Sequence, residues 1–152
     1  MLKLSLIELF LRLIPEGFIL ALSIYAFSNT EINVKRYIIS GIILTVNPYF
    51  IRMLPINFGV HTILLIMCYI LVAANINGLE ILKAIKSGLI AYIVLSVCEF
   101  ANLFFVSNVL NISVEKVVEN IALKMLLGLP SLILFLIIVF YFYKKTEENK
   151  NV

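Results

Sequence analysis

His61 and Cys68 are the residues of this chain best suited to nucleophilic chemistry, because the sequence has one histidine and two cysteines. A thiol peptidase needs a cysteine thiolate and a histidine base at hydrogen-bond distance. Seven residues on a helix place both side chains on one face, but about 10.5 Å apart along the axis. Leucine, isoleucine and methionine precede Cys68, and apolar surroundings make a thiol inert. We therefore expect His61 to be a pocket or interfacial residue and Cys68 to be a packing residue.

A second set of polar residues interrupts long apolar stretches. Glu8, Arg12 and Glu16 have i, i+4, i+8 spacing and share one helix face. A later stripe has similar helical spacing and consists of Tyr92, Ser96, Glu99 and Asn102. Ionisable groups inside a membrane span cost about 2.5 to 3.5 kcal/mol on insertion scales, so they normally face a bundle interior with partners. Both stripes therefore predict polar contacts between membrane helices.

The composition indicates the scaffold that positions these residues. Of the 152 residues, 62% are hydrophobic and 14% are charged, and the mean hydropathy is +1.09. A soluble domain of this size could not hide that much apolar surface. The sequence predicts an all-α, polytopic membrane helix bundle, with residues 1–143 as one transmembrane domain and the lipid bilayer as its surroundings. The small net charge of +3 gives no nucleic-acid patch, and the absence of aspartate argues against a metal site.

Five transmembrane spans fit the apolar pattern. The first four cover residues 2–27, 37–54, 60–74 and 79–110. Ser113 has the character of an N-cap that opens an interfacial helix, which Pro130 interrupts before a fifth span ending at Lys145. Because the second and third spans are short, a re-entrant hairpin within residues 37–75, with four spans, is the alternative. Residues 144–152 are expected to form a disordered cytoplasmic tail.

Lysine and arginine placement predicts the orientation of the bundle in the cell membrane. One side has seven basic residues in its loops and tail: Lys35, Arg36, Lys83, Lys86, Lys144, Lys145 and Lys150. The other side has three: Lys3, Arg52 and Lys116. Basic residues concentrate in cytoplasmic loops, so we expect the N-terminus outside and the C-terminus in the cytoplasm.

In this orientation, polar residues from four spans lie in the outer half of the membrane and form a candidate ligand-binding chamber. Its residues are Arg12, Glu16, Asn47, Arg52, His61, Glu99 and Asn102. We expect Arg12, Arg52 and His61 to contact an anionic group of a peptide or lipid ligand. Glu16 and Glu99 would supply counter-charges.

Two other interpretations of these polar residues remain open. Buried ion pairs can simply lock helices together. Alternatively, Glu99 could take up and release a proton in a small transporter subunit or proton-coupled carrier, although no inverted repeat is visible.

Three stretches, "LFLRLIPEGFILAL", "IRMLPINFGVHTIL" and "ILKAIKSGLIAYI", resemble the membrane-embedded half of Gram-positive, peptide-quorum-type (GHKL) sensor histidine kinases. The resemblance covers residues 5–143 and consists of the span pattern with Pro-Glu and Arg-x-x-Pro-x-x-x-Gly-x-His motifs. Only "KKTEENKNV" follows Tyr143, without a phospho-accepting histidine or an ATP lid. The resemblance therefore implies a sensor module without its kinase, or a stand-alone relative that acts through a partner. Together with the polar chamber, it leads us to expect a non-enzymatic sensor that binds an extracellular or lipid-borne ligand and signals to a protein partner or within a homo-oligomer.

The string "HTILLIMC" also resembles the His/Cys pair of membrane peptidases that process accessory-gene-regulator autoinducer peptides. The glycine-rich, basic lead-in of that family is missing, and "NFG" stands in its place. In the predicted orientation His61 and Cys68 lie in the outer half of the membrane, whereas that processing is expected from the cytoplasmic side. We therefore expect a protein that is not an enzyme and has no cofactor.

Overall fold

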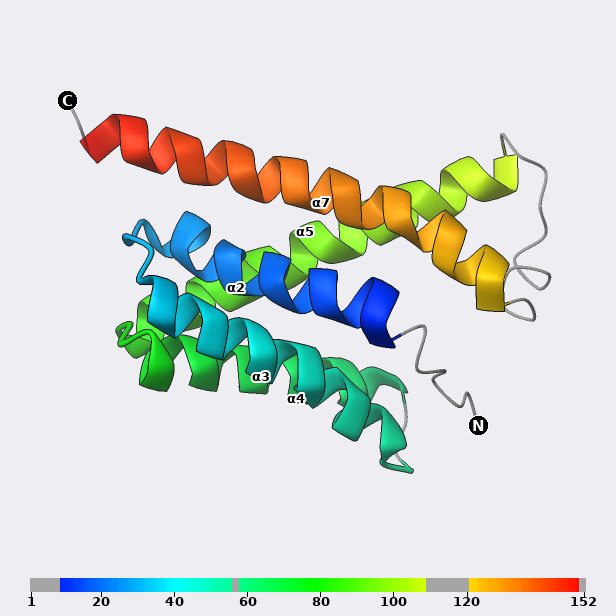
Figure 1. Ribbon diagram of the computed structural model, residues 1–152, viewed down its shortest axis with the longest axis horizontal. Coiled ribbons are helices and arrows are strands. Elements are labelled where there is room, and N and C mark those ends of the chain that lie inside the picture. Colours follow the sequence, from blue (N-terminus) through cyan, green and yellow to red (C-terminus); the bar gives the residue numbers. More distant parts are fainter. Residues whose placement is uncertain (1–8, 56–57, 109–120, 151–152) are drawn as a thin grey trace.

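The computed structural model describes residues 9–55, 58–108 and 121–150, and every regular element in these ranges is a helix (Figure 1). In chain order they are the π-helical turn η1 (Leu9–Leu13), α2 (Ile14–Ser28), α3 (Val34–Met53), α4 (Phe58–Leu71), the π-helical turn η2 (Val72–Ile76), α5 (Ile81–Asn108) and α7 (Ile121–Lys150). Because η1 leads directly into α2 and η2 continues α4, the described chain forms five helical rods. The predicted all-α bundle is confirmed.

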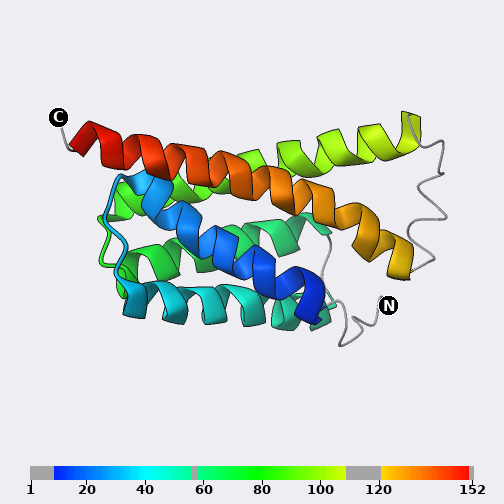
Figure 2. The same ribbon diagram turned by 45° about the horizontal axis from the view of Figure 1, so that its top comes forward.

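The rods alternate in direction, which places the connections at two opposite ends of the bundle (Figures 1 and 2). At one end, which we call the Arg12 end, α2 begins, α3 gives way to α4, α5 ends and α7 begins. At the other, the Asn77 end, lie the 29–33 and 77–80 connections and the end of α7. α3 and α4 lie side by side, and α2 packs against α3, α5 and α7.

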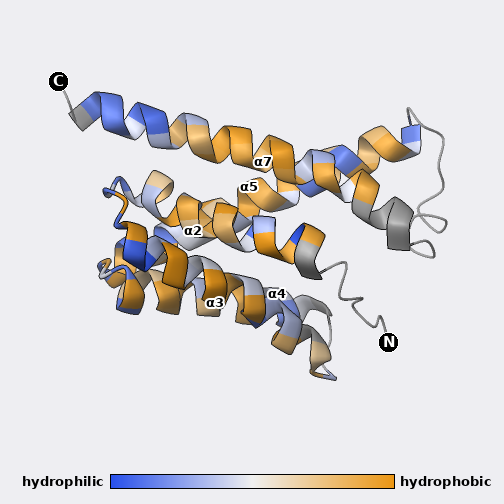
Figure 3. Ribbon diagram, viewed as in Figure 1, coloured by the Kyte–Doolittle hydropathy of each residue, from blue (hydrophilic) through white to orange (hydrophobic). Residues whose placement is uncertain are grey.

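In the part of the chain that the structure describes, four helical segments are long and apolar enough to cross a membrane: Leu11–Ser28, Gly59–Ile76, Ile81–Asn108 and Leu126–Asn149. The hydropathy colouring shows that apolar residues predominate along these helices (Figure 3), and many of their large apolar side chains are exposed. Ile93, Phe100 and Ile137, for example, are each more than half exposed. A soluble protein would hide such side chains, whereas hydrocarbon solvates them. The chain is a multi-pass membrane protein.

α3 is not among these four segments, because basic residues at its ends lower its hydropathy. Its 20 residues nevertheless span about 30 Å, the thickness of a hydrocarbon core. It lies between α2 and α4, so a membrane that surrounds those helices also surrounds α3. These lengths favour two crossing helices within residues 37–75 over a re-entrant hairpin.

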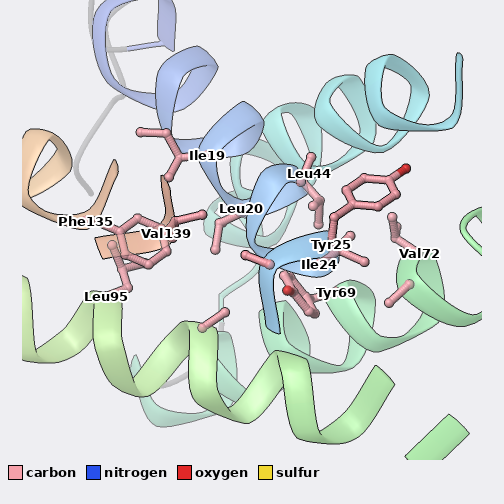
Figure 4. Close-up of a cluster of buried hydrophobic side chains, with 14 of the residues drawn as sticks. Ile19, Leu20, Ile24, Tyr25, Leu44, Tyr69, Val72, Leu95, Phe135 and Val139 are labelled. Atoms are coloured by element: carbon pink, nitrogen blue, oxygen red, sulfur yellow. The ribbon is translucent and has the colours of Figure 1, made fainter. Parts of the chain in front are cut away.

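Small residues let the helices approach one another around a central core (Figure 4). Ala21, Ala73, Ala84 and Ala91 are fully enclosed, and the aromatic rings of Tyr69 and Phe135 are buried among the helices. In a bilayer, helix association relies on close packing and interhelical hydrogen bonds, because lipid tails are as apolar as the helix surfaces. The core therefore combines close contacts at small residues with buried aliphatic and aromatic side chains.

Two features of α7 differ from the sequence prediction. Pro130 was expected to interrupt the last span, but α7 runs through it without a break. Proline is tolerated inside membrane helices where other donors serve the freed carbonyls. The chain from Lys144 to Lys150 was expected to be disordered, but it forms the last turns of α7. The Thr146 hydroxyl holds these turns to the end of α2, 2.8 Å from Asn29 Oδ1. Ser113, the expected N-cap, lies outside the described residues.

Candidate functional site: an ion cluster between α2, α5 and α7

Arg12 joins two helices that are far apart in the sequence. Its Nη2 atom donates to Glu99 Oε1 of α5 at 2.9 Å, across 87 residues of chain. Its Nε atom lies 3.9 Å from Glu16 Oε2, one turn along its own helix. The Arg12 and Glu16 side chains are 22% and 13% exposed, whereas the Glu99 side chain is 41% exposed. We call these three residues the ion cluster, and Glu99 is its most accessible member.

The backbone of α7 forms one wall of the ion cluster. A Cβ atom built on Gly128 would lie 3.2 Å from Arg12 Nη1 and 3.6 Å from Arg12 Cζ. The guanidinium group therefore lies against the α7 backbone, at a position where any side chain would crowd it. Arg12 thus contacts α5 through charge and α7 through close packing.

Asn102 lies about one turn beyond Glu99 on α5, and its Nδ2 atom donates to the carbonyl oxygen of Leu127 in α7. Pro130 follows in the next turn and cannot donate a backbone hydrogen bond to Leu126. The Ser131 hydroxyl also donates to a carbonyl of this turn, that of Gly128, at 2.7 Å. Asn102 and Ser131 therefore supply side-chain donors to two carbonyls within one turn of Pro130, where α7 stays helical.

Arg12 itself lies in an irregular part of its helix. It belongs to the π-helical turn η1, which ends at Leu13, two residues before Pro15. Because Pro15 has no backbone N–H, it cannot donate to the carbonyl of Leu11, and the wider π turn replaces the regular α pattern. π turns inside helices are frequently found at functional sites. The ion cluster therefore lies at the π-helical turn that leads into α2, and against α7 two residues before Pro130.

The structure brings Arg12, Glu16 and Glu99 together and places Asn102 beside them. Asn47 lies elsewhere, in a groove between α3 and α4. His61 is in the first turn of α4, where its Nδ1 atom is buried. Of the other polar residues that the sequence analysis named, Tyr92 packs edge-on against Tyr69 and Ser96 is exposed. The Arg52 side chain is not described, and Glu8 lies outside the described residues.

The geometry of His61 and Cys68 follows from a continuous helix. Both belong to α4, which runs unbroken from Phe58 to Leu71. They therefore lie about 10.5 Å apart along its axis, as the sequence analysis expected. Cys68 is half-buried and lines the α3–α4 groove, while Cys98 is 1% exposed and belongs to the core.

A polar network at the Asn77 end was not predicted from the sequence. The side chain of Asn77 accepts a hydrogen bond from the Tyr25 hydroxyl and donates to Ser40 Oγ at 2.8 Å. Its backbone oxygen accepts from Arg36 Nη1 at 3.1 Å. A single buried asparagine thus links α2 and α3 to the connection before α5. No local pattern marks such a residue, because its partners come from distant parts of the chain.

A pair of hydroxyl groups in the middle of the bundle was also not predicted from the sequence. The hydroxyl oxygens of Ser23 and Tyr69 lie 2.9 Å apart, and the Ser23 hydroxyl also donates to the Leu20 carbonyl. Tyr69 is fully buried, so this contact helps to satisfy a phenol that lies away from water. It joins α2 to α4.

Comparisons of the chain with protein-family models, with curated proteins and with solved structures found no match. The resemblances to sensor kinases and to autoinducer peptidases therefore stay predictions. Within the described ranges, no group of three histidine, cysteine, aspartate or glutamate residues could hold a metal ion. The ion cluster couples three helices through one guanidinium group.

Proposed function

We propose that this protein is a non-enzymatic membrane sensor module and that the ion cluster is its ligand-responsive site. The observation that carries the proposal is the 2.9 Å contact between Arg12 and Glu99, which joins α2 to α5 beside the α7 backbone. Glu99 is partly exposed, so a ligand group can reach it. A ligand that competes for either member of this pair changes the attachment of α5 to α2.

The charges of the ion cluster indicate the class of ligand. Two carboxylates and one guanidinium group give these three side chains a formal charge of −1. A positive group is therefore attracted, whereas an anion must first displace a carboxylate from Arg12. This differs from the sequence analysis, which assigned the ligand contact to the basic residues. We propose that the site takes an ammonium or guanidinium group, carried by an extracellular peptide or by a lipid.

The helices that meet at the ion cluster also reach the opposite end of the bundle. α5 extends from Glu99 back to Ile81, near the Asn77 end, and α7 extends from Gly128 to Thr146, which bonds Asn29. Packed helices move as rigid bodies that shift by small amounts relative to one another. Release of α5 at the Arg12 end would therefore displace its start at the Asn77 end, where a protein partner could detect the change.

The direct test is ligand-induced thermal stabilisation of the purified protein in lipid nanodiscs. Cationic peptides, amine-bearing lipids and anionic counterparts are compared on wild type and on Glu99→Gln. Glu80→Gln is the matched control, because Glu80 is exposed and its ion pair with Lys83, at 3.7 Å, lies outside the cluster. We expect cationic ligands to raise Tm in wild type and in Glu80→Gln, but not in Glu99→Gln. Equal melting curves with every ligand class would overturn the proposal.

A proton-coupled carrier is the second candidate. It is favoured because the two carboxylates beside Arg12, those of Glu16 and Glu99, come from different helices. Protonation of Glu99 would remove its attraction to Arg12 and leave Glu16, 3.9 Å from the guanidinium group, as the remaining counter-charge. Such an exchange could couple proton uptake to a helix movement. The test is uptake by proteoliposomes under a pH gradient. Robust uptake by wild type that disappears in Glu99→Gln would replace the sensor with a carrier.

A further inference from the structure

A groove of about 470 Å³ runs between α3 and α4 and opens to the outside of the bundle. It is lined by Ile42, Ile43, Val46, Asn47, Phe50, Cys68, Leu71 and Val72. Most of these side chains are exposed, so the groove is part of the surface that faces hydrocarbon. Asn47 is the one strongly polar side chain in an otherwise apolar lining.

The amide group of Asn47 has no hydrogen bond to any other residue that the structure describes. Asn47 lies six residues, or about 9 Å, inside the end of α3, which places it within the hydrocarbon layer. Neither lipid tails nor the apolar groove lining can accept or donate a hydrogen bond. Polar side chains on membrane helices normally satisfy such groups by bonding across to another helix. The Asn47 amide therefore has a donor and an acceptor that the described part of the chain does not satisfy.

We propose that the α3–α4 groove is the contact surface between two copies of this chain, with the two Asn47 amides hydrogen-bonded to each other. A carboxamide has both a donor and an acceptor, so two of them form a self-complementary pair with two hydrogen bonds. Two copies inserted in the same orientation hold Asn47 at the same depth. A twofold axis along the membrane normal then brings Asn47 opposite its counterpart, as an isologous dimer requires.

The shape of the groove suits a second copy better than a single lipid tail. Ile42, Val46 and Phe50 project at i, i+4 and i+8 along one face of α3, which is the row that interdigitates in helix packing. A lipid chain could fill the same volume, but it would leave the Asn47 amide without a hydrogen-bond partner.

Dimer formation in bilayers is the first test. Copies that carry donor or acceptor fluorophores at the C-terminus are reconstituted at decreasing protein-to-lipid ratios, and energy transfer gives the dissociation constant. We expect Asn47→Leu to weaken dimerisation about tenfold, through the loss of two interhelical hydrogen bonds, and Asn47→Gln to retain it. Asn108→Leu is the matched control, because its amide bonds Phe104 of its own helix and lies away from the groove. Monomeric wild type, or equal dimerisation of Asn47→Leu and wild type, would overturn the proposal.

Cys68 provides an independent reporter inside the groove. In a Cys98→Ala background, copper-phenanthroline with oxygen should join Cys68 to its counterpart, and Asn47→Leu should reduce the yield. Ile137→Cys in a background without Cys68 and Cys98 is the control, since Ile137 faces outward from α7. A higher yield at Ile137 than at Cys68 would place the interface on α7. If a photoreactive lipid labels Cys68 and no disulfide-linked dimer forms, the occupant of the groove is a lipid. Both results contradict the dimer.

Discussion

Gly17 of α2 lies directly against Thr45 of α3: a Cβ atom at Gly17 would be 2.7 Å from the Thr45 backbone nitrogen and 2.9 Å from its Cα. One turn away the contact is reciprocal, because the ring of Phe18 covers Gly41 of α3. Each helix therefore supplies a glycine over which the other helix packs. This close crossing fixes the depth of α2 relative to α3, and with it the depth of Arg12.

Gly17→Ala should lower the stability of the folded protein by about 1 to 3 kcal/mol, the usual cost of overpacking. The added methyl group meets backbone atoms that cannot move aside as a side chain could. Urea titration in detergent micelles, followed by circular dichroism, measures the loss. Gly59→Ala is the control, because no other helix in the described ranges comes within 4 Å of the position its Cβ would occupy. Equal effects of the two substitutions would refute the close crossing.

Arg12→Leu should destabilise the bundle by up to about 3 kcal/mol, since it leaves Glu16 and Glu99 without their counter-ion. The partial exposure of Glu99 keeps the loss below that of a fully buried pair. The double variant Arg12→Leu/Glu99→Leu should recover part of the stability, because it removes one uncompensated charge. A double-mutant cycle on unfolding free energies measures this coupling. Strictly additive effects would show that the two residues do not interact.

Asn77→Ala should cost about 2 kcal/mol or more, because the Tyr25 and Ser40 hydroxyls lose a buried partner. Asn75→Ala is the natural comparison, since Asn75 is exposed and bonds only the Leu71 carbonyl of its own helix. The thermal unfolding midpoints of the two variants should therefore differ clearly. If Asn75→Ala lowers the midpoint as much as Asn77→Ala does, the network at the Asn77 end contributes little.

The orientation of the bundle is tested by single cysteines in a Cys68→Ala/Cys98→Ala background. Buried Asn77 is a poor reporter, whereas Glu80 at the same end has a 77% exposed side chain. Gly59 is exposed at the Arg12 end. With the N-terminus outside, an impermeant maleimide applied to intact cells should label Gly59→Cys and spare Glu80→Cys. The opposite pattern would place the ion cluster in the cytoplasmic half and remove the argument for an extracellular ligand.

Apolar run lengths predicted the helical rods well, because crossing a bilayer constrains length and composition more tightly than any soluble fold does. The pairing of Arg12 with Glu16 could also be read from their four-residue spacing. The contact with Glu99 could not, since spacing within one helix says nothing about which face of α5 meets α2. Sequence analysis placed both residues at the same depth but could not bring them into contact.

Asn77 and Thr146 show why other contacts between helices could not be predicted from the sequence. Their sequence neighbourhoods indicate a turn and a polar tail, and their roles depend on partners 52 and 117 residues away. Pro130 was misjudged for a related reason. Its effect on α7 depends on donors such as Asn102, which lies on another helix.

The 87 residues between Arg12 and Glu99 also have a consequence for how the chain is made. At about 5 to 20 residues per second, a ribosome needs roughly 4 to 17 s to add Glu99 after Arg12. Throughout that interval the partner of the Arg12 guanidinium group on α5 does not yet exist. Glu16, one turn away, is synthesised almost at once and can act as a temporary counter-ion. Glu16 would then act as a counter-ion to Arg12 during biogenesis, before the helix bundle has formed.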